Sequence, residues 1–369
     1  MGRRTRSAGF TLVELLTVMF IISLLIAMLV PAMNLARNAA KKTATSQMFH
    51  AIDVGLSCFK NDHERYFPQT FGYPPSFAHP PIRGVTFEPH LGQFPYIEGS
   101  PAPVVTGAHW LAMALIGLDG QGFVQRSSVP DRDNLRSEPW RWYEADPLGD
   151  GMLERDPLYV DPNGLRLVRT DQLVGKREEQ FFPDWNRMKQ LNVITDNFGQ
   201  AVLYYAANAN GRTSNMVGTE RDEQNRYGDS PEDYQEYGPP IYFHQDNKAF
   251  TGDASGVSNP SEYEEKGGGW NYGTGTHPIA QPGADLNAET ITEGAGSDEW
   301  DPRRTFAGFI VDRTLLRSLE EKRRDGETPE PSTPLRPVNP DSYILISAGV
   351  DGRYGTNDDV TNFSMTSEY

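Results

Sequence analysis

The sequence predicts an α+β protein, in which a long N-terminal α-helix packs on a C-terminal head built on an antiparallel sheet with long loop insertions. Three observations lead to this fold class. An apolar run opens the chain and continues as a helical stripe, short segments of β-type composition come much later, at 201–206 and 343–347, and glycine and proline concentrate after Tyr66. A helical period followed by separate β-type segments among many turn residues is typical of α+β proteins.

The first predicted element is an apolar helix long enough to cross a membrane. Residues 15–33 carry no charge, and at about 1.5 Å per residue they cover most of a hydrocarbon core of roughly 30 Å. Glu14 stands at the start of this run, and a basic leader with Arg3, Arg4 and Arg6 precedes it. Because a charge at membrane depth costs about 2.5–3.5 kcal/mol, we expect Glu14 to have a function and a partner.

Two simpler interpretations compete for this segment. A secretory signal peptide has a shorter apolar region that ends at a small-residue cleavage site, whereas this run is longer and begins with Glu14. A plain single-pass anchor explains the length of the run and the cluster of leader arginines, but it leaves Glu14 without a role.

The N-terminal segment resembles the type IV prepilin and type II secretion pseudopilin family. That family begins with a short basic leader ending in glycine, followed by Phe, Thr, Leu, a small or β-branched residue and Glu, and then by a hydrophobic stretch. Here the matching residues are Gly9, Phe10, Thr11, Leu12, Val13 and Glu14. The resemblance implies that a prepilin peptidase cleaves between Gly9 and Phe10, removing residues 1–9, and that Phe10 is N-methylated. It also implies that Glu14 pairs with the Phe10 amine of an adjacent subunit during assembly.

The helix is expected to continue beyond the membrane or filament-core segment 10–33 as an amphipathic stretch, 34–66. Its apolar residues recur at steps of three or four: Met33, Ala36, Ala40, Ala44, Met48, Ile52, Leu56 and Phe59. Pro31 favours a kink, and the family often has a proline at this place. Cys58 is the single cysteine, which excludes an intramolecular disulfide, and its place beside the stripe predicts a small buried side chain.

The predicted head, 67–369, is rich in loops. Residues 110–117 are expected to form a short buried helix closed by a glycine, 305–324 to be helical, and the Pro-rich 329–340 to be an extended linker. Residues 208–303, rich in glycine, asparagine, aspartate and serine, are expected to be a long insertion of exposed loops. With 50 acidic and 34 basic residues the net charge is −16, and losing the three leader arginines takes it to −19. Such a charge disfavours nonspecific binding to nucleic acids.

The C-terminal region 341–363 contains a candidate cation site. Asp351, Asp358 and Asp359 fall within nine positions, among glycines that permit sharp turns. Ca²⁺ prefers six to eight oxygen ligands, but the spacing is not that of an EF-hand, and a polar Asp-Gly turn without metal is the alternative.

This C-terminal segment resembles the C-terminal loop of the major type II secretion pseudopilin, which reads Ser-x-Gly-x-Asp-Gly, a spacer, then an acidic pair. The resemblance implies that Ca²⁺ is bound by Asp351, Asp358 and Asp359, with Ser347 and carbonyls near Leu345 and Asn357 completing the ligand set. A weaker resemblance is the turn Asp196-Asn197-Phe198-Gly199, since pseudopilins often carry an Asp-x-aromatic-Gly turn that leads into the first sheet strand.

The sequence carries no pattern that indicates an enzyme: it has neither a G-x-S-x-G nor an H-E-x-x-H motif, and only one cysteine. We therefore expect a structural subunit of a type II secretion pseudopilus in the cytoplasmic membrane, with its head in the periplasm. Its expected partners are the prepilin peptidase, other pilin or pseudopilin subunits, and an inner-membrane assembly platform with its ATPase. The alternatives are a type IV pilus subunit or adhesin, or a membrane-anchored binding or hydrolytic domain.

Overall fold

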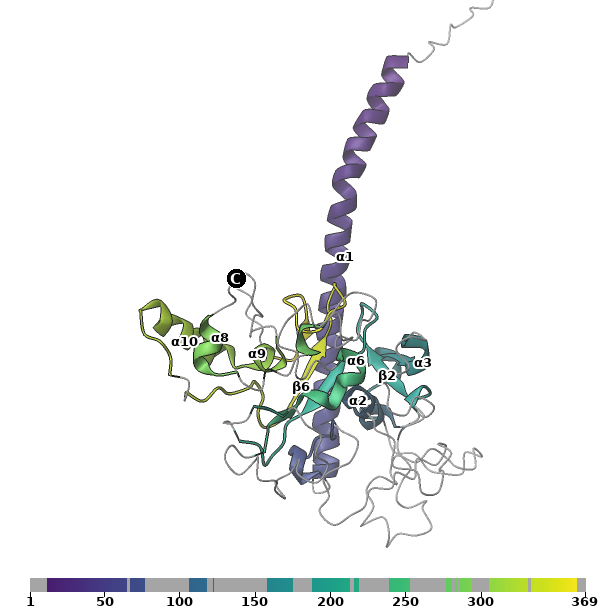
Figure 1. The fold of residues 1–369 in the computed structure, drawn as a ribbon. Helices are drawn as coiled ribbons and strands as arrows, with labels where there is room; N and C mark the ends of the chain where they lie inside the picture. Colours follow the sequence, from purple (N-terminus) through teal and green to yellow (C-terminus); the bar gives the residue numbers. More distant parts are fainter. Residues whose placement is uncertain are drawn as a thin grey trace, which may run out of the picture. The chain divides into compact units, whose positions relative to one another are not determined.

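In a computed structural model of the chain, the described residues are 12–64, 67–76, 106–117, 122, 158–174, 188–212, 216–218, 239–252, 277–280, 283, 286–293, 305–330 and 333–363. The chain forms two compact units, Met1–Ala44 and Thr45–Tyr369. Figure 1 shows a long helix and a head that combines short helices with short strands, so the α+β class is confirmed.

The helix α1 (Leu12–His63) is a single α-helix of 52 residues, and Pro31 lies inside it without ending it. In the first unit its large apolar side chains are exposed, from Leu12 at 76% to Leu35 at 72%. Within the described part of the chain, α1 is the helix whose length and composition would allow it to cross a membrane. This agrees with the predicted membrane anchor.

In the second unit, one face of α1 belongs to the core of the head. The buried side chains follow the predicted stripe, and the buried residues of the helix are Thr45, Met48, Phe49, Ile52, Gly55, Leu56 and Phe59. The prediction that Cys58 is buried is wrong, because its side chain is exposed. Cys58 precedes the buried Phe59 by one residue, and one residue turns a helix by about 100°, which places the thiol outside the stripe.

A three-stranded antiparallel sheet forms the centre of the head, in the order β3-β6-β7. Its strands are β3 (Leu203–Ala206), β6 (Tyr343–Ser347) and β7 (Val360–Thr361), with Leu203 paired to Ile346 and Ser347 paired to Val360. Both predicted strands are therefore confirmed, and they lie side by side although they are far apart in the sequence (Figure 1).

Alternate residues of these strands serve two hydrophobic clusters, as the pleat of a strand requires. Tyr204 and Leu345 join the cluster that contains Ile52 and Leu56 of α1. Their neighbours in the strands face the other cluster, whose members include Leu203, Tyr205, Ile344, Ile346 and Phe306. The sheet is therefore buried on both faces, which explains why its strands consist almost entirely of apolar residues.

The predicted short helix is confirmed as α2 (Gly107–Ile116), which packs against β3. Gly107 permits this close packing, because a Cβ atom there would lie 1.9 Å from the Tyr204 carbonyl oxygen. The helix ends at Gly117, whose φ of 80° lies in the region that favours glycine.

Two small sheets were not predicted. The strands β1 (Arg166–Arg169) and β2 (Asn192–Thr195) pair antiparallel, while β4 (Val217–Gly218) and β5 (Tyr242–Phe243) pair parallel. These strands have only two to four residues, and β1 begins and ends with an exposed arginine. Such short stretches do not show the alternation by which a strand is recognised.

The prediction that 208–303 forms exposed loops is wrong for the part that the structure describes. This segment contains α6 (Lys248–Thr251) and α8 (Ala288–Glu293), and it sends several fully buried side chains into the larger cluster: Tyr242, Phe250, Ile279, Ala288 and Ile291. Next in the chain come α9 (Phe306–Ile310) and α10 (Arg313–Arg324), and α10 packs on α8 (Figure 1). The described insertion is thus a structural part of the head.

Candidate functional site

The N-terminal processing site is only partly described. Gly9 and Phe10 lie outside the described residues, and α1 begins at Leu12. Glu14 lies in the first turn of α1 at an exposed position, and its backbone carbonyl accepts a hydrogen bond from the Thr17 hydroxyl at 3.0 Å. The cleavage, methylation and assembly roles of these residues remain predictions.

The three predicted carboxylates come together in the turn that joins β6 to β7. One oxygen from each of Asp351, Asp358 and Asp359 lies within 4.8 Å of the others. The turn is tight enough to need glycine: Gly349 has a φ of 62°, and a Cβ atom there would lie 2.5 Å from the Asp358 carbonyl oxygen. Because oxygens are the ligands that Ca²⁺ and Mg²⁺ prefer, this donor set fits a hard divalent cation.

Backbone amides already orient the carboxylates. Asp358 Oδ2 accepts hydrogen bonds from the amides of Val350 (2.5 Å) and Asp351 (3.0 Å), and Asp359 Oδ2 accepts one from the Gly355 amide (2.7 Å). The Thr356 hydroxyl lies 2.6 Å from Asp358 Oδ1 and 3.2 Å from Asp359 Oδ1. Its single proton can satisfy only one of these oxygens at a time.

The surroundings of the turn disfavour the simultaneous ionisation of its three carboxyl groups. Burial raises the pKa of Asp359 well above its usual range, and the neighbouring charge of Asp358 acts in the same direction. The pKa of Asp351 is raised as well, first by burial and then by Asp358. A cation held between these groups would favour their ionised forms, as opposite charges do.

Ser347, the fourth predicted ligand, makes a different contact. Its hydroxyl donates to Asp196 Oδ2 at 2.6 Å. Asp196 Oδ1 in turn accepts the backbone amides of Phe198 (2.8 Å), Gly199 (2.7 Å) and Gln200 (2.9 Å), which forms the Asp-x-aromatic-Gly turn before β3. Ser347 therefore links the two motifs that the sequence analysis treated separately, and its role as a ligand stays a prediction.

The acidic turn is also held by residues of the insertion, a contact that the sequence did not predict. The Tyr354 amide donates to His277 Nδ1 (3.2 Å), their rings lie 5.1 Å apart, and the Tyr354 hydroxyl donates to the Ala201 carbonyl (2.5 Å). A Cβ atom at Gly355 would lie 2.5 Å from the Ile279 side chain. The insertion thus packs directly on the turn, and only a histidine without a recognisable motif marks this contact in the sequence.

Comparison with protein families identifies the N-terminal segment. Residues 4–30 match the model of the prokaryotic N-terminal methylation motif, a range that includes Gly9, Phe10 and Glu14. Neither the comparison with curated proteins nor that with solved structures found a match. The motif implies processing by a prepilin peptidase and assembly with other pilin-like subunits. Residues 4–30 therefore carry the N-terminal methylation motif that is typical of type IV prepilins and pseudopilins.

Proposed function

We propose that this protein is a structural subunit of a type II secretion pseudopilus. The observation that carries the proposal is the methylation motif at residues 4–30, with Glu14 at the start of a helix whose apolar side chains are exposed. An exposed apolar helix needs either lipid or other apolar helices around it, so it suits a subunit that leaves the membrane to enter a filament.

Glu14 would set the register of that filament. Removal of residues 1–9 would create an amine on Phe10, and an adjacent subunit would offer this amine to Glu14. Buried ion pairs add little net stability, but breaking one strands a charge at about 3–5 kcal/mol, so such a pair selects one register over others. The apolar face of α1 would supply affinity, and Glu14 would supply specificity.

The acidic turn supports the secretion system over a pilus. In this proposal Ca²⁺ is held by Asp351, Asp358 and Asp359, with backbone carbonyls and the Ser347 oxygen as further ligands. A bound cation would balance the charge of three adjacent carboxylates and tie β7 to the end of β6. The donor set in the described turn supports this role, as does its resemblance to the C-terminal loop of the major pseudopilin.

The remaining components follow from the same proposal. The subunit would be inserted in the cytoplasmic membrane with its head in the periplasm, trimmed by the prepilin peptidase, and extracted by an inner-membrane platform that an ATPase drives. No catalytic role is proposed, because the motif at the N-terminus is that of a structural subunit.

Mass spectrometry of protein purified from its native host tests the processing. We expect an N-terminus at Phe10 that carries one added methyl group. A Gly9→Glu variant, which alters the residue before the cleavage site, should keep residues 1–9 and serves as the control. Native protein that retains its first nine residues would contradict the proposal and would favour a plain membrane anchor.

A knockout strain separates the secretion role from an adhesive pilus. If the knockout loses protein export into the medium but attaches to surfaces normally, the pseudopilus role is supported. If it exports proteins normally but no longer attaches, the adhesin role is supported. Deleting 208–303 cannot make this distinction, because the described part of this segment includes the fully buried Tyr242, Phe250 and Ile279.

A further inference from the structure

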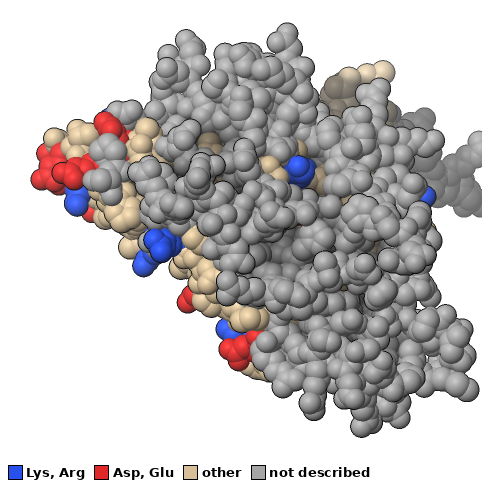
Figure 2. Space-filling model, turned by 60° about the horizontal axis from the view of Figure 1, so that its bottom comes forward, with Lys and Arg blue, Asp and Glu red and all other residues tan. Residues whose placement is uncertain are grey.

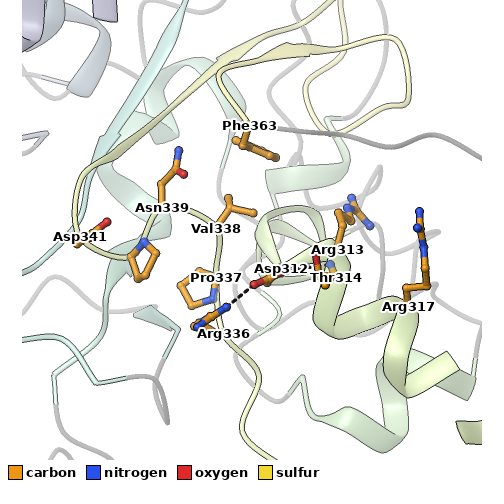
Figure 3. Close-up of a pocket in the computed structure, with 11 residues that line it drawn as sticks. Asp312, Arg313, Thr314, Arg317, Arg336, Pro337, Val338, Asn339, Asp341 and Phe363 are labelled. Atoms are coloured by element: carbon orange, nitrogen blue, oxygen red, sulfur yellow. Dashed lines mark hydrogen bonds and ion pairs between the residues drawn. The ribbon is translucent and has the colours of Figure 1, made fainter. Parts of the chain in front are cut away.

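A cavity of about 650 Å³ lies beside the start of α10 (Figure 3). One wall is the start of α10 with Arg313 and, one turn later, Arg317, and the opposite wall is the segment from Arg336 to Asp341. Its volume falls within the range of about 300–1,000 Å³ that is usual for ligand sites. None of the residues assigned above to assembly or to calcium binding lines it.

The walls of the cavity are rigid. The Asp312 amide donates to the Arg336 carbonyl and the Val338 amide donates to the Ile310 carbonyl, both at 2.8 Å, which pairs the two walls in antiparallel fashion. The Asn339 carbonyl accepts the Tyr242 hydroxyl at 2.5 Å, and this holds Asn339 at a φ of 48°, in the left-handed region. Since Ile310 and Tyr242 are fully buried, the core of the head fixes the shape of the cavity.

Two of the charges that line the cavity neutralise each other. Arg336 pairs with Asp312 Oδ2 at 2.7 Å, while Asp312 Oδ1 caps α10 through the amides of Thr314 (2.9 Å) and Leu315 (3.4 Å). Burial opposes ionisation of Asp312, yet the Arg336 hydrogen bond and these amides lower its pKa. Asp312 is therefore a stable carboxylate whose oxygens are already used.

The remaining charges are arranged asymmetrically. Arg313 and Arg317 lie one helical turn apart at one end of the cavity, Asp341 lies at the other end, and Val338 and Phe363 lie between them (Figure 3). Arg313 donates to the Phe309 carbonyl at 3.3 Å. The exposed Arg317 makes no hydrogen bond or ion pair to any residue that the structure describes. Two arginine side chains therefore line this end of the cavity.

We propose that this cavity binds a short acidic peptide segment of a partner protein. A glutamate or aspartate carboxylate would bind the guanidinium of Arg317, with Arg313 beside it, since arginine forms paired hydrogen bonds with carboxylates. An apolar side chain of the peptide would pack on Val338 and Phe363, and a peptide N–H group would donate to Asp341 or to the Asn339 side-chain oxygen. The cavity presents cationic, apolar and hydrogen-bond acceptor groups in succession. A peptide can offer an acidic, an apolar and a donor group in the same succession, whereas a uniformly charged ligand cannot.

Long polyanions fit this surface poorly. Nucleic acids and acidic polysaccharides carry regular charge over lengths well beyond the cavity, so the net charge of −16 would repel them. A short peptide can place one carboxylate next to Arg317, within the Debye length of roughly 8 Å at physiological salt. The arginines beside the cavity therefore affect its binding more than distant charges do.

Fluorescence anisotropy with the full-length protein in a non-ionic detergent tests the proposal. The probe is a fluorescein-labelled hexapeptide in which glutamate and leucine alternate, and the control probe has glutamine in place of glutamate. We expect the glutamate peptide to bind and the Arg317→Gln variant to weaken its binding by about tenfold, because a charge-assisted hydrogen bond is lost. Arg324→Gln is the matched control, since Arg324 is an exposed arginine on the same helix, about 10 Å further along.

The outcomes are separable. Equal binding of the glutamine peptide, or equal losses in Arg317→Gln and Arg324→Gln, would overturn the proposal in favour of general surface attraction. If inorganic phosphate displaces the peptide at lower concentrations than sodium glutamate does, the proposal that the site recognises a carboxylate would be overturned. A third outcome is that the peptide does not bind and that the protein self-associates unless Arg317 is replaced by Gln. This would assign the cavity to a second copy of the chain and overturn the proposal of a separate partner protein. Unchanged melting temperatures of both variants confirm that they fold.

Discussion

Asp196 shows how a single buried carboxylate can organise two distant segments. Its two oxygens accept three backbone amides of the turn before β3 and the hydroxyl of Ser347 at the end of β6. Burial nevertheless raises its pKa, and the four hydrogen bonds only partly oppose this shift. The position therefore needs hydrogen-bond acceptors more than it needs a negative charge.

This leads to a contrast between two substitutions of Asp196. Asp196→Ala should lower the free energy of unfolding by about 3–5 kcal/mol, because several buried donors lose their partner. Asp196→Asn should cost about 1–2 kcal/mol, since the amide oxygen keeps the turn and the Ser347 hydroxyl can rotate to accept from the amide nitrogen. Denaturant titration measures both, with Asp161→Ala in an exposed turn as the control. Equal effects of Asp196→Ala and Asp161→Ala would refute the organising role.

His109 is a fully buried histidine whose hydrogen bonds define its protonation. The Thr170 hydroxyl donates to the Leu191 carbonyl (2.9 Å), so it accepts from His109 Nε2 (2.8 Å), and Nδ1 then accepts from the Thr106 hydroxyl (2.7 Å). Burial lowers the pKa of His109 to about 3. The folded protein therefore keeps this side chain neutral at pH values where the unfolded chain protonates it.

The stabilising effect of neutral His109 should be present above the unfolded pKa of about 6.5 and should be lost as the pH falls toward 3. Over this window the free energy of unfolding of the wild type should fall by about 1.4 kcal/mol per pH unit more than that of His109→Gln. Denaturant titrations at pH 6.5, 5.5 and 4.5 measure the difference, and the exposed His50→Gln controls for the loss of a histidine. Parallel pH profiles for wild type and His109→Gln would show that this histidine does not set the slope.

At the scale of elements, the turn between β6 and β7 tests the calcium proposal. At a hundredfold excess over its Kd, Ca²⁺ should raise the melting temperature by about 5–10 °C, and a chelator should reverse the gain. Asp358→Ala should remove this sensitivity, whereas Asp325→Ala, outside the turn at the end of α10, should retain it. Differential scanning fluorimetry provides the readout. A wild-type melt that is the same with calcium and with chelator would exclude the metal.

The elements also show what could be predicted from the sequence. Helix α2 and strands β3 and β6 are continuous apolar runs, so local composition located them. The three carboxylates of the turn are close in the chain, and their proximity in space could be predicted for that reason. The contacts of Ser347 with Asp196 and of Tyr354 with His277 join residues 151 and 77 positions apart. No local pattern reveals such contacts, and the polar composition of 208–303 concealed the few apolar residues that enter the core.

At the scale of the whole molecule, the surface of the head and the surface of the N-terminal helix differ in polarity. Figure 2 shows basic and acidic side chains side by side on the described part of one face of the head, as expected for a surface in water. The exposed side chains of α1 between Leu12 and Leu35 are mainly apolar. Assembly is therefore expected to depend on α1, and Glu14 is the residue through which to test it.

Glu14→Val should leave membrane insertion and cleavage intact, but it should reduce filament yield by about tenfold or more, because the Phe10 amine of a neighbour would be buried without a partner. Thr17→Val is the matched control, since the Thr17 hydroxyl bonds only the Glu14 carbonyl of its own helix among the described residues. Quantifying sheared filaments against total membrane protein measures the effect. Normal yield from Glu14→Val would argue against a register role for this carboxylate.

The order of the central sheet has a consequence for biogenesis. Its middle strand, β6, is made last but one, and it separates β3 from β7, which begins only at Val360. Until the ribosome has released Tyr343 and the residues after it, β3 lacks its neighbour in this described sheet. In the proposed topology, the emerging polypeptide would therefore cross the bilayer before this sheet is assembled. Pairings between such remote stretches form slowly and leave sticky intermediates. If the head is exported as proposed, the new chain would pass through an interval in which a holdase or a protease could bind it before it enters a polymer.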